Sequence, residues 1–319
     1  MTMKFKDNLF LWIKMKGLSR KEIIALLQSK CYEEFKGLDG ITLSRWLNGK
    51  STPPIYKQFY IAKILDVDLK EYIQSLDLSN VKNPLKHNTI VYNLTKVLDF
   101  SISVLSYRYV PKVVSSEVSN DSYQEHLEKF GEFYGNISSL KEFKNDLYTM
   151  GSNIDYKSVV IKNGEDEIIG HWSGILDIEK LNGSPSFITI PSNEIDKSCL
   201  VFLGYYANSE HYFELIVQAI CLYLISYYKT KDYIYFFNVD CRPIIEFCKL
   251  IFNAEEVKYY PPLDEKDKMG VYLLKFNIIK SIANPILLSM IQQKLNCLST
   301  CNYESCKLCN LQEIEKNTR

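Results

Sequence analysis

The sequence predicts a multidomain protein of α and α/β class. The first 75 residues combine helical spacing of apolar side chains with helix-capping residues, which indicates a small all-α domain. Farther along, short apolar runs typical of strands alternate with helical segments, an order that indicates a sheet with helices packed on it. We therefore expect a helical domain at 1–75, a linker at 76–93, an α/β domain at 94–280, and a helix with a cysteine-rich tail at 281–319.

Several short helices are expected in the N-terminal domain. Ser19 and Glu22 have the spacing of a capping box, which opens a helix. Gly49 and the Pro53–Pro54 pair end a later helix. The helical segments that we expect are Lys4–Lys16, Ser19 to about Phe35, a short helix that begins near Ile41 and stops at Gly49, and Ile55–Ile73.

Two short helices in succession, the second with small polar and basic side chains, form the arrangement by which a helix-turn-helix enters the major groove. The elements Ser44-Arg45-Trp46, Gly49-Lys50 and Pro53 resemble the Cro/C1-type (XRE) family over about the first 75 residues, with an insertion in the turn at 35–40. The resemblance implies a helix-turn-helix bundle that binds double-stranded DNA. The implied DNA-binding residues are Arg20, Lys21, Gly40, Ile41, Thr42, Ser44, Arg45 and Lys50. The alternative is a helical domain whose basic residues are only a solvated face.

Charge and composition agree with a DNA-binding module joined to a domain that does not touch DNA. Formal net charge is zero, but residues 1–75 carry +5 and the remainder −5. No secretory signal is visible, and the longest apolar stretch, Leu215–Tyr228, is too short to span a bilayer. The nine cysteines are expected to be reduced. We expect a cytoplasmic protein without a membrane partner.

The α/β domain is expected to have the order β-αα-ββ-β-α-β-α-β. Apolar runs predict the strands, and Asn163-Gly164 predicts the turn of a hairpin. The expected strands are Ser101–Val110, Lys157–Lys162, Glu167–Leu176, Cys199–Tyr206, Tyr233–Val239 and Gly270–Phe276. The expected helices are Tyr123–Phe133, Leu140–Met150, His211–Lys229 and Pro243–Phe252.

This order, with the segments 159–170 and 242–254, resembles the GNAT acyltransferase fold. In that family a glycine-rich loop at the start of a helix holds the pyrophosphate of acetyl-CoA. The corresponding segment here, 207–215, has no glycine and carries Glu210 and Glu214, whose charge would repel the cofactor. We therefore expect no catalytic residues and a noncatalytic domain that senses a small-molecule effector or holds a homodimer together, although Glu255 and Tyr259 are candidates for a general base and acid.

The tail contains the pattern Cys297-x3-Cys301-x4-Cys306-x2-Cys309. Four thiolates can close a tetrahedral zinc site. The alternatives are reduced thiols in a frayed tail, or thiols that sense redox state. Zinc is the cofactor that the sequence suggests.

Taken together, these features predict a sequence-specific DNA-binding transcriptional regulator with a GNAT-like sensor or dimerisation domain. The first alternative is an acyl-CoA-dependent N-acyltransferase with an appended DNA-binding head. The second is an interaction protein of a phage or mobile element. The sequence specifies neither an operator, an effector, an oligomeric state nor the direction of regulation.

Overall fold

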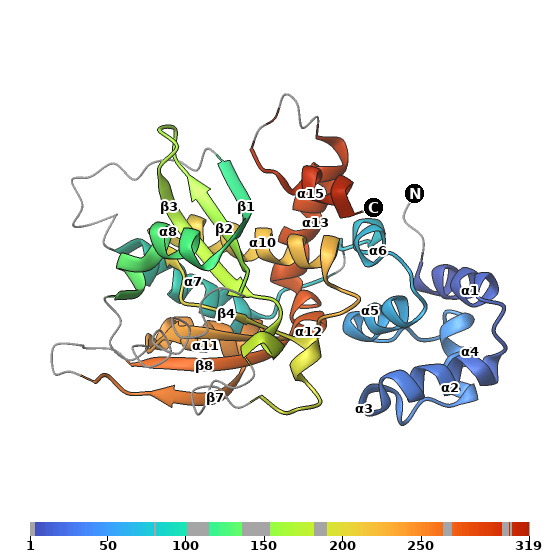
Figure 1. Ribbon diagram of the computed structural model, residues 1–319. Coiled ribbons are helices and arrows are strands. Elements are labelled where there is room, and N and C mark those ends of the chain that lie inside the picture. Colours follow the sequence, from blue (N-terminus) through green and yellow to red (C-terminus); the bar gives the residue numbers. More distant parts are fainter. Residues whose placement is uncertain are drawn as a thin grey trace.

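A group of short N-terminal helices lies beside a larger α/β part (Figure 1). The computed structural model describes residues 4–79, 81–100, 115–135, 154–181, 190–263, 270–301, 306 and 308–318. In the described residues no helix is long and apolar enough to span a membrane.

The N-terminal helices follow the predicted order. The Ser19 hydroxyl accepts a hydrogen bond from the Glu22 amide at 3.3 Å, and the Glu22 carboxylate accepts one from the Ser19 amide at 2.7 Å, so the capping box is formed. The second helix is shorter than predicted, because Cys31 has a non-helical backbone conformation. The bounds are α1 Phe5–Met15, α2 Arg20–Lys30, α3 Tyr32–Phe35, α4 Gly40–Leu47, α5 Ile55–Ile64 and α6 Leu69–Ser75.

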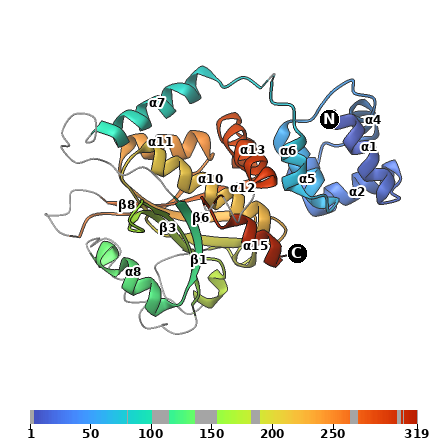
Figure 2. The same ribbon diagram turned by 90° about the horizontal axis from the view of Figure 1, so that it is seen from above.

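Helix α7, Leu85–Phe100, begins inside the segment that we expected to be a linker. The carbonyl of Pro84 accepts hydrogen bonds from the amides of His87 and Asn88, which starts the helix directly after the proline. The segment 76–93 is therefore not a linker throughout, because its residues from Leu85 onward are helical. Helix α7 runs along the outside of the α/β part next to α11, Arg242–Ile251 (Figure 2).

One mixed sheet organises the α/β part. Its order is β1-β2-β3-β4-β6-β8-β7, with β5 paired to β3. The β4–β6 pair is parallel and all other pairs are antiparallel. A mixed sheet covered by helices confirms the α/β class predicted from the sequence. The bounds are β1 Ser115–Asp121, β2 Tyr156–Lys162, β3 Ile168–Ile175, β4 Ser198–Val201, β5 Tyr205–Tyr206, β6 Tyr233–Val239, β7 Glu255–Tyr260 and β8 Val271–Asn277.

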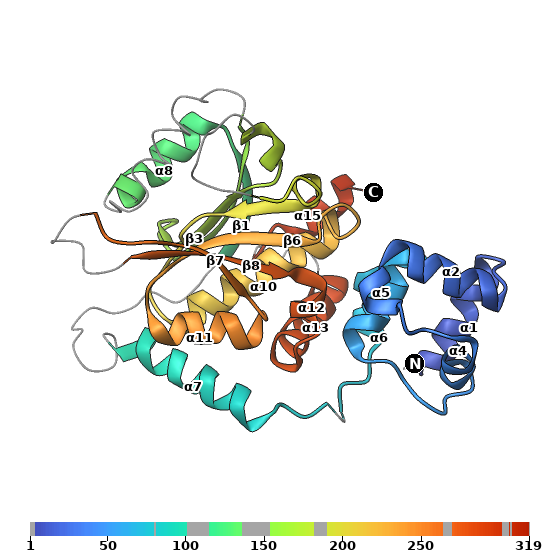
Figure 3. The ribbon, with the colours of Figure 1, turned by 90° about the horizontal axis from the view of Figure 1, so that it is seen from below.

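Helices cover both faces of the sheet. Helix α8, Tyr123–Gly135, lies on one face, whereas α10, Ser209–Ser226, and α11 lie on the other (Figure 3). Apolar residues occur on nearly every side of α10, which is consistent with its burial against the sheet and the neighbouring helices. Shorter elements complete the chain: the 3-10 turns Ile178–Leu181 and Ile195–Lys197, and helices α12 Ile278–Ile282, α13 Pro285–Thr300 and α15 Leu311–Thr318.

Most elements predicted for the α/β part are confirmed within a few residues, with three differences. The segment predicted as one strand from Cys199 to Tyr206 is divided into β4 and β5. Strands β1 and β7 were not predicted, because their sequences are mostly polar. The predicted strand Ser101–Val110 and helix Leu140–Met150 lie outside the described residues.

The N-terminal helices are fixed to the α/β part by opposite charges and backbone contacts. Lys63 pairs with Asp232 at 2.6 Å, and Lys280 pairs with Glu34 at 2.5 Å. The amide group of Gln292 donates hydrogen bonds to the carbonyls of Ile73 and Leu76 at 2.9 and 2.8 Å. In the first ion pair the cation belongs to the head, and in the second the cation belongs to the α/β part.

Candidate functional site

The parallel strands β4 and β6 separate at their carboxyl ends. Their pairing covers only Ser198–Val201 against Tyr233–Phe236. After Val201 the chain turns toward β3, where β5 pairs with Gly170 and His171. Among the described residues, Phe237, Asn238 and Val239 of β6 consequently have no ladder partner on the β4 side. Ligands of open α/β sheets bind at such a point, outside the carboxyl ends of the strands.

A small cleft lies at this separation. A Cβ atom on Gly204 would stand 2.8 Å from both the His171 carbonyl oxygen and Trp172 Cδ1, so only glycine fits there. Gly174 on β3 is equally restricted, since its Cβ would stand 2.5 Å from the Leu200 carbonyl oxygen. The cleft is lined by Trp172, Leu203, Gly204, Tyr206, Tyr212, Phe237, Asn238 and Val239.

The N-terminus of α10 lies directly after the cleft strands and is already occupied by a carboxylate. Asp99, near the end of α7, accepts hydrogen bonds from the Ser209 amide at 2.7 Å and the Ser209 hydroxyl at 2.8 Å. The Asn208 side chain accepts a further one from the His211 amide at 2.8 Å. A helix N-terminus attracts anions through its free amides and its dipole. Asp99 therefore takes the position that a phosphate group would take.

Glu214 does not add charge at this end, contrary to the prediction. Its carboxylate accepts hydrogen bonds from Lys294 at 3.1 Å, Gln218 at 2.7 Å and Ser116 at 3.2 Å. Burial would raise the pKa of Glu214, but the charge of Lys294 and these hydrogen bonds hold it below the ordinary value. Glu214 is thus a compensated buried anion. Glu210, in contrast, is exposed in the first turn of α10.

Two buried histidines lie on the opposite face of the sheet, under α8. His171 on β3 stacks on Phe130 at 4.0 Å between ring centroids, and His126 stacks on Tyr156 at 4.1 Å. Within the described residues His171 Nε2 and His126 Nδ1 have no hydrogen-bond partner. Burial lowers the pKa of His171 to about 3 and that of His126 to about 4, so both rings are neutral at pH 7.

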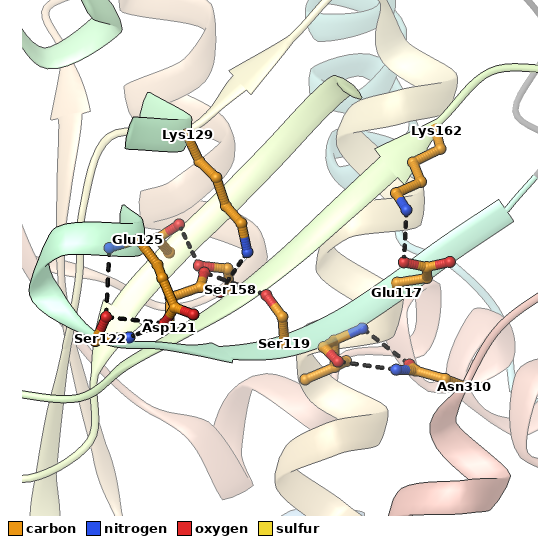
Figure 4. A network of polar contacts seen from close by, with 11 residues as sticks. Glu117, Ser119, Asp121, Ser122, Glu125, Lys129, Ser158, Lys162 and Asn310 are labelled. Atoms are coloured by element: carbon orange, nitrogen blue, oxygen red, sulfur yellow. Dashed lines mark hydrogen bonds and ion pairs between the residues drawn. The ribbon is translucent and has the colours of Figure 1, made fainter. Parts of the chain in front are cut away.

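Beside these histidines, β1 and α8 carry a polar network (Figure 4). Asp121 is almost completely buried and pairs with Lys129 at 2.5 Å. Burial would raise the pKa of Asp121, but hydrogen bonds from Lys129 and Ser158 hold it below the ordinary value. Ser158 also shares a hydrogen bond with Ser173 at 2.9 Å. The carboxylate is compensated and joins β1, β2 and α8.

Glu255 and Tyr259, the predicted acid–base candidates, do not line the cleft. Both are exposed on the edge strand β7. Glu255 lies opposite Lys275 in the ladder, and the Tyr259 hydroxyl donates to Asp240 at 3.2 Å. The structure gives neither residue a place in a site.

The residues predicted to contact DNA lie on the N-terminal helices. Arg20, Lys21, Gly40, Ile41, Arg45 and Lys50 are exposed, whereas Thr42 and Ser44 are half-buried. Asp39 caps α4, accepting a hydrogen bond from the Thr42 amide at 2.7 Å, and Leu43 and Trp46 are buried. Such exposure is equally that of any solvated helix face, so these positions do not by themselves make a nucleic-acid interface.

The four tail cysteines are spread over the end of α13 and the segment before α15. Cys297 is exposed, and Cys301, Cys306 and Cys309 are half-buried. A hydrogen bond with Cys306, together with burial, raises the pKa of the Cys301 thiol to about 11. The pKa of Cys306 is lowered, first by a backbone hydrogen bond from Leu308 and then by the hydrogen bond with Cys301. In the described residues no three His, Cys, Asp or Glu side chains come together as a metal site. Zinc binding stays a prediction.

Solved structures that resemble this chain are N-acetyltransferases from Vibrio cholerae. A spermidine/spermine N-acetyltransferase SpeG is 12% identical over 52% of this chain and 96% of its own, with a TM-score of 0.32. A spermidine N-acetyltransferase in complex with CoA and spermine is 13% identical over 62% and 94%, with a TM-score of 0.28. No family model and no curated protein matches the chain. Identities of this size concern the fold alone.

These findings correct the prediction of a DNA-binding transcriptional regulator and of DNA as the partner. The matched structures are acetyltransferases, and the alternative that we drew from the sequence, an acyl-CoA-dependent N-acyltransferase, fits them better. The prediction failed because a basic helical head was taken as a DNA-binding module. Two cations of the head, Lys63 and Lys70, pair with Asp232 and Glu315 of the same chain, although neither is among the residues predicted to contact DNA.

Several residues of the cleft were missed by sequence reasoning. Trp172, which lines the cleft, belongs to the run Gly170-His171-Trp172-Ser173-Gly174, which was assigned only as a strand. Its two glycines, unusual inside a strand, were the available signal for a close approach of another chain segment. Asp99 gave no local signal, because its partner Ser209 lies 110 residues away.

Proposed function

We propose that the chain is an acyl-CoA-dependent N-acyltransferase that binds its acyl donor in the cleft between β4 and β6. The observation that carries the proposal is the separation of these parallel strands, which leaves Phe237–Val239 without a ladder partner among the described residues. The pantetheine arm of CoA contains two amide groups. Such an arm can add to the free strand edge as an extra strand does.

Tyr206 is the residue that we assign to proton transfer. It lines the cleft, and burial raises its pKa, so its hydroxyl is protonated at neutral pH. The nitrogen of an unprotonated amine forms a bond to the thioester carbonyl carbon, and the carbon–sulfur bond breaks. The Tyr206 hydroxyl gives its proton to the leaving thiolate, and the proton lost by the amine restores the hydroxyl.

His171 is the residue that we assign to the acceptor side. It is neutral at pH 7, has an unpartnered Nε2 among the described residues, and follows Gly170 beside β5. A pKa of about 3 makes it a weak base. We therefore assign it the role of a hydrogen-bond acceptor, and not of a base, for an amine that enters from the α8 face of the sheet, where its ring stacks on Phe130.

The test is a turnover assay with acetyl-CoA and a panel of primary amines, including polyamines and lysine peptides. Release of the CoA thiol is followed together with the mass of the acylated amine. Tyr206→Phe should lower kcat at least tenfold, whereas its neighbour Tyr205→Phe, which is exposed and does not line the cleft, should leave kcat unchanged. Equal activity of the two variants would remove Tyr206 from the mechanism. Absence of product with every amine would overturn the proposed function.

A further inference from the structure

A second cavity lies inside the α/β part, on the other side of Trp172, which lines both it and the cleft. It occupies about 110 Å³ between α10 and the sheet face that α10 covers. Its wall is almost entirely apolar and includes Val159, Trp172, Ile216, Ile220, Phe236 and Phe276. Protein interiors are close-packed and contain few voids larger than a water molecule. An apolar space of this size is therefore suited to an apolar group of a ligand.

One end of this cavity is polar. Lys157, Ile175, Leu176 and Tyr227 line both the cavity and an adjoining pocket of about 340 Å³. Lys157 on β2 lies opposite Gly174 in the ladder of β2 and β3. The cavity therefore continues into the outer pocket past a lysine and a tyrosine.

Lys157 differs from the other charged groups at this end because it forms no ion pair within the described residues. Lys180 pairs with Asp155 at 3.4 Å and with Asp177 at 3.8 Å. The Lys231 ammonium donates to the Asp196 carbonyl at 3.1 Å and lies 3.8 Å from Asp177. Lys157 is half-buried, and burial lowers its pKa although the charge of Asp121 acts in the opposite direction. A half-buried cation without a partner is a site for an anion.

We propose that this cavity binds a monocarboxylate with a short aliphatic tail, a short- to medium-chain fatty acid. The carboxylate pairs with Lys157, and the tail lies between α10 and the sheet. An engineered apolar cavity of about 150 Å³ binds benzene, so the space here suits a tail of roughly four to six carbons. This site is separate from the cleft and does not depend on the proposed function.

The experiment is calorimetric titration of the full chain with butyrate, hexanoate, octanoate and decanoate. Hexanoate should bind at one site and raise the melting temperature. Lys157→Met keeps the length of the side chain but removes its charge, and should weaken hexanoate at least tenfold. Lys162→Met is the matched control, because Lys162 lies on the same strand but is paired with Glu117 and Asp166, and it should leave binding unchanged.

A second variant tests the position of the tail. Ala219 on α10 lines the cavity, so Ala219→Leu should fill part of it and abolish hexanoate binding in a protein that still melts cooperatively. Hexanol and hexanoyl-CoA carry the same aliphatic tail as hexanoate but no carboxylate on it, so they test whether the carboxylate is recognised. The proposal would be overturned if hexanol bound as tightly as hexanoate, if only hexanoyl-CoA bound, or if no carboxylate bound. Failure of acetyl-CoA turnover would leave it standing.

Discussion

Replacing Asp99 tests whether the N-terminus of α10 is a phosphate site that the chain itself occupies. The Asp99 carboxylate accepts two hydrogen bonds from Ser209, at 2.7 and 2.8 Å. Asp99→Asn keeps the shape of the side chain but removes its negative charge. Loss of the favourable interaction with the helix dipole, and weakening of charge-assisted hydrogen bonds, should lower the free energy of unfolding by about 1–2 kcal/mol.

The same change should strengthen the binding of CoA. A carboxylate about 4 Å from a phosphate charge costs about 4 kcal/mol at an effective dielectric constant near 20, and exposure to solvent reduces this value. We expect a net gain of about 1–2 kcal/mol in binding free energy, which corresponds to roughly a 5- to 30-fold lower Kd. The variant would thus be less stable than the natural protein and yet bind CoA more tightly.

Calorimetric titration with CoA at low and high salt measures the gain, and urea unfolding measures the stability. Asp177→Asn is the control, because it removes one negative charge at a position far from Ser209 in the fold. A Kd for CoA that is the same in the natural protein, Asp99→Asn and Asp177→Asn would refute the assignment of this helix end to the pyrophosphate.

Three further predictions concern stability and the tail. His126 and His171 have folded-state pKa values of about 4 and 3, below the unfolded value near 6.5, so the unfolded chain binds more protons in this range. The free energy of unfolding should have its full value above pH 6.5 and should fall by roughly 3–5 kcal/mol toward pH 4.5. Urea midpoints across this range measure the loss, which should largely disappear when both residues are replaced by phenylalanine. A double variant whose stability falls with pH as steeply as that of the natural protein would contradict the assignment. Ser19→Ala removes the capping hydroxyl of α2 and should cost about 1 kcal/mol of unfolding free energy, with Ser29→Ala, elsewhere on the same helix, as the control. If the tail cysteines bind zinc, elemental analysis of protein purified without chelator should find about one metal ion per chain. The double variant Cys306→Ser and Cys309→Ser should lose this metal. A metal-free preparation of the natural protein would exclude the site.

The parts of the fold predicted from the sequence are those with strong local patterns. The hairpin of β2 and β3 has apolar runs on either side of Asn163-Gly164, and β6 and α10 are long apolar segments. Strand β7 was missed because most of its residues are exposed at the edge of the sheet, where no apolar pattern is required. The start of α7 was missed because it depends on Pro84 and on packing against α11, and the residues 76–93 are rich in polar side chains.

The candidate site was less predictable than the fold because it depends on contacts between distant segments. Gly204 is required by the backbone of β3, and Asp99 meets Ser209 only after α7 has packed on the α/β part. The charge of Glu214 was correctly noted, but its compensation by Lys294, 80 residues later, leaves no trace in the local sequence. Burial also decides the protonation state of His126 and His171.

A crystal structure with a non-hydrolysable acetyl-CoA analogue tests the central claim most directly. The account predicts the pantetheine arm beside Phe237–Val239 of β6, the thioester position next to Tyr206, and the pyrophosphate at the Ser209 amide in place of the Asp99 carboxylate. An analogue bound elsewhere, or a cleft that remains empty at saturating analogue while Asp99 stays on Ser209, would contradict it.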